Sequence, residues 1–394
     1  MSSKTSIPFY RNPVVRGIAT QAAAAILVVW ALYTIFENTI TNLRDRGIQT
    51  GFDFFNQVAP FAVGFSPFIE FKLGESTYWT IFFIGLQNTI IVSVLGIIGA
   101  TTVGFIIGVM RLSPNYLLSR FALIYIETFR NIPLLLQIMF WYFAVFLPLF
   151  PLPRESFDLA SGVFLNNRGL YLPKPVLGEG VGIWALGIAI ILGIVAYIML
   201  VRWAKKKQYD TGQRPPGRVY GLLTIAGLIA VVFLLFDTPL RFEFPELGRF
   251  NLNGGMQLPL PLFALWFALT TYTGAFIAEE VRGAIRSVPH GQTEASESLG
   301  LPRTKMLQLV IIPQALRVMI PPTINQYLNL TKNSSLATAV AYEELVSIWA
   351  GTALNQTGQA LVIMAITFGV YIGLSLTTSI ILNWYNKRVQ MVER

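Results

Sequence analysis

The chain has 394 residues, of which 54% are hydrophobic and only 12% are charged, and its mean hydropathy is +0.58. A soluble globular protein carries about 25% charged residues, so the composition disfavours an ordinary cytosolic enzyme. The chain contains no Cys and one His, His290, which excludes a disulfide framework, a thiolate nucleophile and a Cys-based metal site. The formal net charge of +9 would indicate a nucleic-acid partner only if the chain were soluble.

Eight stretches are long and apolar enough to cross a membrane, which requires about 20 residues in a helix. The predicted spans are Ile18–Phe36, Trp79–Met110, Leu118–Phe150, Val181–Trp203, Val219–Phe236, Leu258–Ile285, Met306–Leu330 and Gly358–Trp384. Several exceed the minimum length, so we expect tilted or kinked helices. The first span is not a cleaved signal peptide, because it is long and no small-residue cleavage pattern follows it.

The distribution of basic residues predicts that both termini lie in the cytoplasm. With the N-terminus inside, 18 Lys and Arg residues fall in predicted cytoplasmic segments and 9 fall on the opposite side. Because cytoplasmic loops of membrane proteins carry this excess, topology explains the positive charge and a nucleic-acid partner is excluded. The run Lys205–Lys207 is best interpreted as charge flanking the end of a span, and the alternative is binding of anionic membrane lipid.

Two pairs of glycines have a spacing that lets helix backbones approach closely. Gly104 and Gly108 stand four residues apart in one predicted span, as do Gly369 and Gly373 in another. Such pairs are typical of packed membrane helices. They predict a helix bundle and carry no information about a substrate.

The loop between the sixth and seventh spans is the most informative stretch. Gln292–Leu299 is predicted to form a short helix, because Gly300 suits the left-handed residue that follows a helix and Pro302 forbids its continuation. A helix this short is unstable alone in water, so it must dock on another surface. Either a groove on a partner or the membrane surface would serve, and the residues alone do not decide between them.

This loop resembles the cytoplasmic "EAA" loop of permeases from ATP-binding-cassette (ABC) importers. The family pattern is Glu-Ala-Ala, three residues, Gly, nine residues and then Ile-x-Leu-Pro. The matching residues here are Glu294, Ala295, Ser296, Gly300, Val310, Ile312 and Pro313. The departures, which are Ser296 for Ala, Val310 for Ile and Ile312 for Leu, are conservative in size. The resemblance implies that Glu294, Ala295, Ser296 and Gly300 belong to a coupling helix that fits a cleft on an ATPase subunit.

Further motifs resemble permeases for polar amino acids. They are Gly85–Thr89, Glu127–Gln137, Glu280–Gly283, Val288–Gln292 and Lys332–Leu336. The resemblance covers Trp79–Phe150 and Leu258–Trp384 and implies a five-helix core. The inserted pair Val181–Phe236, the extra first helix and the ending Asn383–Val389 are similar to one permease subunit of the general L-amino-acid transport systems.

The predicted fold class is therefore an all-α integral membrane protein with about eight transmembrane helices. It consists of a five-helix type I ABC importer core, an extra N-terminal helix and an inserted helix pair. The predicted parts are 1–78 (N-terminal tail, first transmembrane helix and external loop), 79–150 (first part of the core), 151–257 (insertion with two transmembrane helices) and 258–394 (second part of the core with the coupling helix).

Charged residues inside the predicted spans form two Glu-x-x-Arg pairs. They involve Glu127, Arg130, Glu279, Glu280 and Arg282. Because charge inside a bilayer is costly and faces protein or water, these residues are candidates for a polar network at the cytoplasmic mouth of a pathway. The favoured alternative is that the pairs neutralise one another and join core helices.

Asn325, Asn329 and Asn333 recur every four residues and so share one helix face. An Asn side chain both donates and accepts hydrogen bonds, as recognition of an amino-acid zwitterion requires. Thr271 and Thr273 in the sixth span are candidates for the same path. The alternative, which is slightly favoured, is that these residues hydrogen-bond neighbouring helices.

The chain is not predicted to be an enzyme. No Gly-Lys dipeptide occurs, which excludes a phosphate-binding P-loop, and one His without Cys cannot build a metal site or a hydrolytic triad. By resemblance, ATP and magnesium belong to a separate ATPase subunit, and this chain itself binds no cofactor.

The predicted function is that of a transmembrane permease subunit in an ATP-driven, binding-protein-dependent importer of polar or broad-range L-amino acids. The implied location is the bacterial inner membrane. The implied partners are an ATPase dimer, a second related permease in a heterodimer, a periplasmic or extracellular amino-acid-binding protein and membrane lipid. The alternatives are a self-contained, ion-coupled secondary carrier, which would be expected to show an inverted repeat that is not found, and a membrane scaffold without a pathway.

Overall fold

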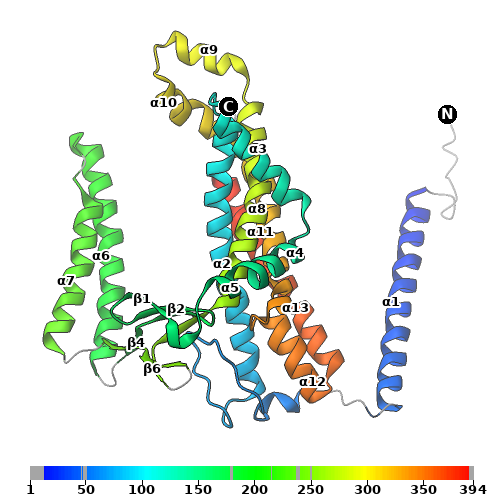
Figure 1. Cartoon of the computed structure of the whole chain (residues 1–394). Coiled ribbons are helices and arrows are strands. Elements are labelled where there is room, and N and C mark those ends of the chain that lie inside the picture. The colour runs from blue at the N-terminus through cyan, green and yellow to red at the C-terminus, as the bar shows by residue number, and fades with distance from the viewer. Residues whose placement is uncertain are drawn as a thin grey trace, which may run out of the picture. The chain divides into compact units, whose positions relative to one another are not determined.

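The computed structural model describes residues 13–45, 47, 51–177, 181–213, 215–236, 240–248 and 251–389 (Figure 1). The beginning of the predicted N-terminal tail lies outside these residues. Of the basic residues counted for the orientation, Lys4, Arg11, Arg46, Arg214, Arg249 and Arg394 also lie outside them. The chain divides into two compact units, of which the first comprises 1–93, 316–338 and 343–394, and the second comprises 94–315 and 339–342.

Seven helices among the described residues are long and apolar enough to cross a membrane, or eight if one bent pair counts as a single span. The seven are α1 (Pro13–Asp45), α2 (Tyr78–Arg111), α6 (Val181–Thr211), α7 (Gly217–Leu235), α8 (Leu260–Ser287), the stretch Arg303–Val340 and α13 (Ala360–Val389). The stretch Arg303–Val340 consists of α10 (Arg303–Met306), the π-helical η5 (Leu307–Ile311), α11 (Ile312–Asn333) and the 3₁₀ segment η6 (Ser334–Val340). The predicted spans are confirmed at these seven places.

The third predicted span, Leu118–Phe150, is not one straight helix. It is divided into α3 (Tyr116–Asn131), α4 (Leu134–Met139), the π-helical η3 (Phe140–Phe146) and α5 (Leu147–Leu149). The halves on either side of Pro133 are bent by 106°. Ile132 takes the extended conformation, with φ −98° and ψ 128°, because a proline excludes the helical region for the residue before it. The expected kink therefore falls at Pro133, and Leu118–Phe150 counts as one span only if the bent pair crosses the membrane as a unit.

Strands that the sequence analysis did not predict connect the inserted helices to the core. Strands β1 (Phe157–Ala160), β2 (Val163–Asn166), β3 (Gly169–Leu172) and β8 (Met256–Pro259) form an antiparallel sheet in that order. Strand β4 (Lys174–Leu177) pairs with β5 (Leu240–Glu243), and β6 (Glu246–Leu247) pairs with β7 (Leu252–Asn253). Because β4 precedes α6 and β5 follows α7, their pairing joins the two ends of the helix pair.

Shorter segments complete the described chain. They are η2 (Asp53–Asn56), η4 (Pro153–Glu155), α9 (His290–Ser298), the π-helical η7 (Leu345–Ala353) and α12 (Leu354–Thr357). In the first unit, the fully buried Trp349 of η7 lies 5.8 Å from Phe54 and 5.2 Å from Phe55, measured between ring centroids. These aromatic contacts fix η2 against η7.

One of the two predicted glycine pairs brings helices together. In the second unit, a Cβ atom on Gly104 would lie 2.7 Å from the Ile277 Cβ, and one on Gly108 would lie 2.7 Å from the Ala278 carbonyl oxygen. Helices α2 and α8 therefore approach as closely as glycine allows. A Cβ on Gly369 or Gly373 would have no heavy atom within 4 Å among the described residues, so the second pair makes no such contact within this chain.

We predict that Gly104→Ala destabilises the protein by about 1–3 kcal/mol, because the added methyl group overpacks the α2–α8 contact. Gly227→Ala is the matched control: it lies in α7, where a Cβ would meet no heavy atom within 4 Å. Alanine is favoured over glycine inside a helix by about 1 kcal/mol, so the control should melt at the same or a higher temperature. Thermal melting of the detergent-purified proteins measures both. Equal melting of Gly104→Ala and wild type would contradict the packing.

Candidate functional site

The loop after α8 folds into the predicted short helix. Helix α9 covers His290–Ser298, against the prediction of Gln292–Leu299. Gly300 has a φ of +68°, the left-handed conformation that glycine adopts without strain. Its N–H donates to the Glu297 carbonyl at 2.8 Å, and the Leu301 N–H donates to the Ser296 carbonyl at 3.1 Å. This is the Schellman pattern, and it confirms the predicted helix end.

Helix α9 packs against η5 of its own chain. Ser296 is 3% exposed, and its hydroxyl donates to the Gln292 carbonyl at 2.6 Å. The Gln314 amide at the start of α11 donates to the Gln292 Oε1 at 3.1 Å. The small Ser296 thus faces the rest of the chain. Part of the surface on which this short helix was predicted to dock is therefore supplied by the chain itself. As a result, α9 is attached to the helix that continues into the seventh predicted span.

The outer face of α9 remains free in the described chain. Glu294 is exposed and lies 3.0 Å from the Nδ1 of His290, while Ala295 and Leu299 are also exposed. A helix of nine residues with this much open surface gains little stability from its own hydrogen bonds. The outer face is therefore available to a partner, whereas Ser296 is not.

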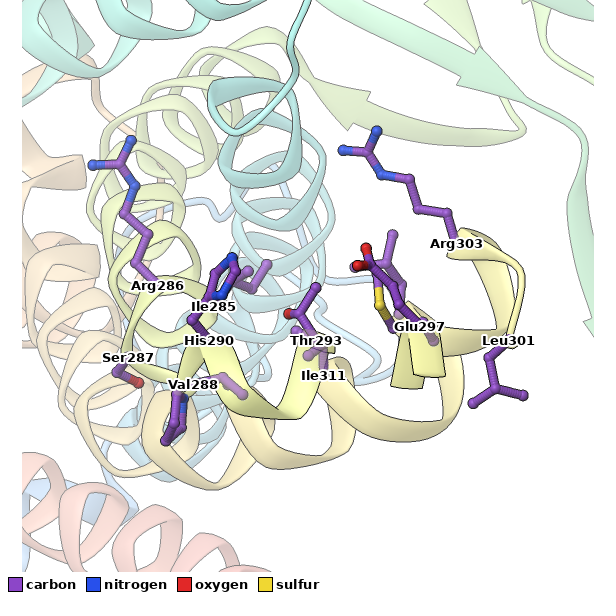
Figure 2. Close-up of a pocket in the computed structure, with 13 residues that line it drawn as sticks. Ile285, Arg286, Ser287, Val288, His290, Thr293, Glu297, Leu301, Arg303 and Ile311 are labelled. Atoms are coloured by element: carbon purple, nitrogen blue, oxygen red, sulfur yellow. The ribbon is translucent and has the colours of Figure 1, made fainter. Parts of the chain in front are cut away.

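A cavity of about 670 Å³ lies behind α9. Figure 2 shows His290, Thr293 and Glu297 of α9 facing it, with Arg303 on the chain that returns to the core. The end of α8 contributes Ile285 to the lining. The loop thus forms an arch whose inner surface carries both charged and apolar side chains.

The predicted charged pairs are only partly formed. Arg282 donates from Nε to the Glu279 carboxylate at 2.8 Å. Glu127 instead accepts from the Asn131 amide at 3.3 Å. The Arg130 guanidinium lies 5.1 Å from the centroid of the Phe276 ring, at cation–π distance. The Glu279–Arg282 pair joins residues of α8 alone, whereas Arg130 links α3 to α8. Glu280 also has an interaction partner.

The three predicted asparagines stand on α11, where Asn325 and Asn329 are exposed and Asn333 is half-buried. A cavity of about 740 Å³ lies beside them in the first unit. Its polar lining residues are Lys332, Ser335, Thr367, Tyr371, Ser375 and Ser379. The asparagines themselves are not part of this lining, but Lys332 directly precedes Asn333. Because consecutive residues of a helix point in different directions, the asparagines lie on a neighbouring face of α11 and not on the face that lines the cavity.

The predicted pathway residues of α8 are buried in the second unit. Thr271 is 7% exposed and Thr273 is 3% exposed. The Thr271 hydroxyl donates to the Phe267 carbonyl at 2.8 Å, and the Thr271 carbonyl accepts from the Tyr125 hydroxyl at 2.8 Å. The first bond lies within α8, and the second holds α3 against α8. A role of Thr271 and Thr273 in a pathway stays a prediction.

Sequence analysis missed a pair of glutamates that holds the first unit together. The Glu344 carboxylate is buried and accepts from the Val346 N–H at 2.9 Å and the Ser347 N–H at 2.8 Å, so it caps η7. The Tyr371 hydroxyl of α13 donates to it at 3.0 Å. Thr89 of α2 accepts from the Leu345 N–H at 3.1 Å. The Thr89 hydroxyl also donates to the Glu344 carboxylate at 3.5 Å, so this carboxylate ties η7 to both α2 and α13.

The neighbouring Glu343 binds the loop before α2. Its carboxylate accepts from the N–H groups of Gly64 and Phe65, each at 2.8 Å. The Asn88 amide donates to the Glu343 carbonyl at 2.7 Å and to the Phe65 carbonyl at 2.9 Å. Adjacent carboxylates in an otherwise apolar stretch are the signal in the sequence that points to this clamp of Glu343 and Glu344.

The chain matches a known protein family and is similar to proteins from three bacteria over nearly its whole length. Residues 219–391 match the family described as "Binding-protein-dependent transport system inner membrane component". The putative amino-acid ABC transporter permease protein YhdX of Escherichia coli (strain K12) is 48% identical over 98% of this chain and 97% of its own length. The general L-amino acid transport system permease protein AapQ of Rhizobium johnstonii is 45% identical, over 97% of this chain and 94% of its own. The glutamate/glutamine/aspartate/asparagine transport system permease protein BztB of Rhodobacter capsulatus is 37% identical, over 96% and 95%.

We predict that Gly300→Ala reduces transport severalfold, because a Cβ in the left-handed region costs about 1–2 kcal/mol and displaces the end of α9. Gly291→Ala is the matched control, since Gly291 lies within α9 at an ordinary φ with open space around its Cα. Uptake by membrane vesicles containing the whole transporter measures the difference. Equal uptake by the two variants would show that the cap geometry is dispensable.

We predict that Glu344→Ala lowers the melting temperature of the purified permease far more than Glu344→Gln does. Each buried donor left without an acceptor costs about 1–3 kcal/mol. Alanine removes the acceptor of the Val346 N–H, the Ser347 N–H and the Tyr371 hydroxyl together. Glutamine keeps one acceptor oxygen. Glu75→Ala, at an exposed position, serves as the control and should melt like wild type. Equal melting of Glu344→Ala and this control would refute the clamp.

Proposed function

Because this chain belongs to the permease family of binding-protein-dependent amino-acid ABC importers, we propose that α9 is the element through which an ATPase subunit drives its transport cycle. The chain is a multi-pass membrane subunit that moves amino acids and is not itself an enzyme, and it works with an ATPase and a binding protein. The proposal rests on how α9 is capped, packed and exposed. The helix is capped at Gly300, packed through Ser296 against η5, and open to a partner at Glu294 and Ala295.

The energy source lies on the ATPase chain in this proposal. ATP and magnesium bind there, and the permease contributes the mechanical link. In this proposal α9 faces the cytoplasm and the bent pair α3–α5 counts as one of eight spans, so both termini lie on the same side as α9, which the 18 basic residues assigned to that side support. A push on α9 is transmitted to α11 through η5 and through the Gln292–Gln314 hydrogen bond.

A second permease subunit completes the pathway in this proposal. Only 17% of the apolar 18-residue segment of α13 is buried within the described chain. Phe368, Ile372, Leu376 and Ile380 are exposed along this helix. A lipid-facing or partner-facing surface has this apolar character. Since the 740 Å³ cavity opens beside α13, a subunit seated on α13 would close it. A related but distinct chain in this place gives the predicted heterodimer.

The cargo in this proposal is a polar or broad range of L-amino acids. The relatives are named for general L-amino acids and for glutamate, glutamine, aspartate and asparagine. Lys332 supplies a positive charge for a substrate carboxylate at the edge of the cavity. Asn325, Asn329 and Asn333 offer donors and acceptors alongside it, and Thr271 and Thr273 remain candidates farther along the path.

The charged residues of α3 and α8 are proposed to line the cytoplasmic mouth of this path. Glu127 and Arg130 are exposed, and Arg282 is half-buried with its partner Glu279. Exposed charge on membrane helices faces a water-filled space or a partner. Glu280 is included in the network because it neighbours Glu279 and has a partner of its own.

We predict that Glu294→Lys lowers recovery of the ATPase subunit with the purified permease at least tenfold and abolishes ATP-driven uptake, because it reverses the charge on the free face of α9. The control is Glu246→Lys on the exposed strand β6, which should assemble and transport normally. Normal assembly and uptake by Glu294→Lys would refute the coupling role. ATP-independent uptake driven by an ion gradient, in liposomes holding this chain alone, would instead support the secondary-carrier alternative.

We predict that Lys332→Gln lowers uptake at saturating substrate about tenfold, which corresponds to the loss of one charge-assisted hydrogen bond. The affinity of the separate binding protein should be unchanged, because that protein is not altered. Lys72→Gln is the control, since Lys72 pairs with Glu70 in the exposed loop before α2. Wild-type uptake by Lys332→Gln would exclude Lys332 from the pathway.

A further inference from the structure

The turn between α6 and α7 concentrates positive charge. Six basic residues and one acidic residue, Asp210, lie between positions 202 and 218. The basic residues are Arg202, Lys205, Lys206, Lys207, Arg214 and Arg218, of which Arg214 lies outside the described residues. No other turn between predicted spans carries as many Lys and Arg residues within so short a stretch.

This charge is not neutralised within the described part of the chain. All five described basic residues are exposed, and none forms an ion pair with a described carboxylate. The Lys207 ammonium lies 5.2 Å from the centroid of the Trp203 ring. A cation over a Trp face retains its charge. The turn therefore presents a positive surface that requires a counter-charge from outside the chain.

The positive surface begins where the apolar part of the helix pair ends. The uncharged stretch of α6 from Trp184 to Val201 has 18 residues, or about 27 Å of helix. In α7 the uncharged stretch from Val219 to Leu235 has 17 residues, or about 26 Å. Both lengths are close to the roughly 30 Å of a bilayer's hydrocarbon core. Arg202 and Arg218 therefore lie at the level of the lipid headgroups.

A cavity of about 330 Å³ lies between the two helices at this level. Val201 and Ala204 line it from α6, and Arg218 and Val219 line it from α7, with Pro215 and Pro216 closing one side. The helices are in close contact here, because a Cβ on Gly217 would lie 2.6 Å from the Ala204 Cβ. Lys205 follows Val201 by four residues and so lies on the same side of α6. The cavity thus has Arg218 in its wall, and Lys205 lies on the side of α6 that supplies the lining residue Val201.

The surroundings of the cavity favour a lipid over an acidic protein. Met199, Leu222 and Leu223, one or two turns toward the membrane, are more than half exposed. A phospholipid meets apolar side chains with its acyl chains and basic side chains with its phosphate, whereas a soluble acidic protein would match only the basic side chains. We propose that the basic end of the α6–α7 pair binds the headgroup of an anionic phospholipid, with its phosphate held by Arg218 and Lys205.

The side of the membrane follows from the connectivity. Helices α6, α7 and α8 are consecutive spans, so the end of α6 and the end of α8 lie on the same side. The proposed lipid site is therefore in the leaflet that faces α9. There it would fix the inserted helix pair to the membrane surface without involving the coupling loop or the cavity beside Lys332.

The test is a titration of the purified transporter complex in mixed micelles with phosphatidylglycerol or phosphatidylcholine, with bound lipids counted by native mass spectrometry. Wild type is expected to prefer phosphatidylglycerol. The double variant Lys205→Gln/Arg218→Gln should bind phosphatidylglycerol about 25-fold more weakly, since each basic residue near an anionic surface contributes about fivefold. Lys205→Arg/Arg218→Lys should bind like wild type. The matched control Arg168→Gln/Lys174→Gln, in the strand region, should also keep the preference.

Three results would overturn the proposal. Equal binding of the two lipids by wild type would show that the basic run serves only to orient the helices during insertion. Displacement of phosphatidylglycerol by excess inorganic phosphate would show that the site holds phosphate alone. Loss of the ATPase subunit from Lys205→Gln/Arg218→Gln in lipid-free micelles would show that the surface contacts a protein.

Discussion

The attachment of α9 to the start of α11 is the constraint on which the account of this permease depends. In the proposed function, the work of transport enters the chain through the α9 loop from a separate ATPase subunit. A lone nine-residue helix would fray in water and transmit nothing. Burial of Ser296, the Gln292–Gln314 hydrogen bond and the left-handed Gly300 together make α9 a fixed projection from α11. In the proposed coupling role, a displacement of its free face would reach the start of α11 through these contacts.

Within the first unit, a second constraint shapes the irregular segment that follows α11. Polar backbone groups buried among apolar helices must find partners inside the protein, and η7 begins with N–H groups that no preceding turn can satisfy. Glu344 accepts two of them, and Glu343 does the same for Gly64 and Phe65. These glutamates permit the chain to leave helical geometry between α11 and α13, beside the cavity proposed for the amino-acid path.

The sequence was sufficient for features that depend on local chemistry. Hydropathy identified the long spans, and the order Gly300, Leu301, Pro302 identified the end of α9. It was insufficient for features that depend on the direction in which the chain turns or on contacts between residues far apart in the sequence. Taken together, the two sides of Pro133 are apolar enough to pass for one span, which hid the 106° bend. The Glu343–Glu344 clamp joins residues more than 250 positions apart along the chain. Glu127 was expected beside Arg130, but its partner is Asn131, because the nearby Phe276 ring holds the guanidinium.

The absence of cysteine from the natural chain allows the most direct measurement, which is cross-linking from a single introduced thiol. Ala295→Cys places a thiol on the free face of α9, and Asp158→Cys places one on the exposed strand β1. The account predicts that Ala295→Cys cross-links to the ATPase subunit and is protected from membrane-impermeant thiol reagents in intact cells, while Asp158→Cys does neither. Labelling of Ala295→Cys from outside the cell, without a cross-link to the ATPase, would contradict the coupling role of α9.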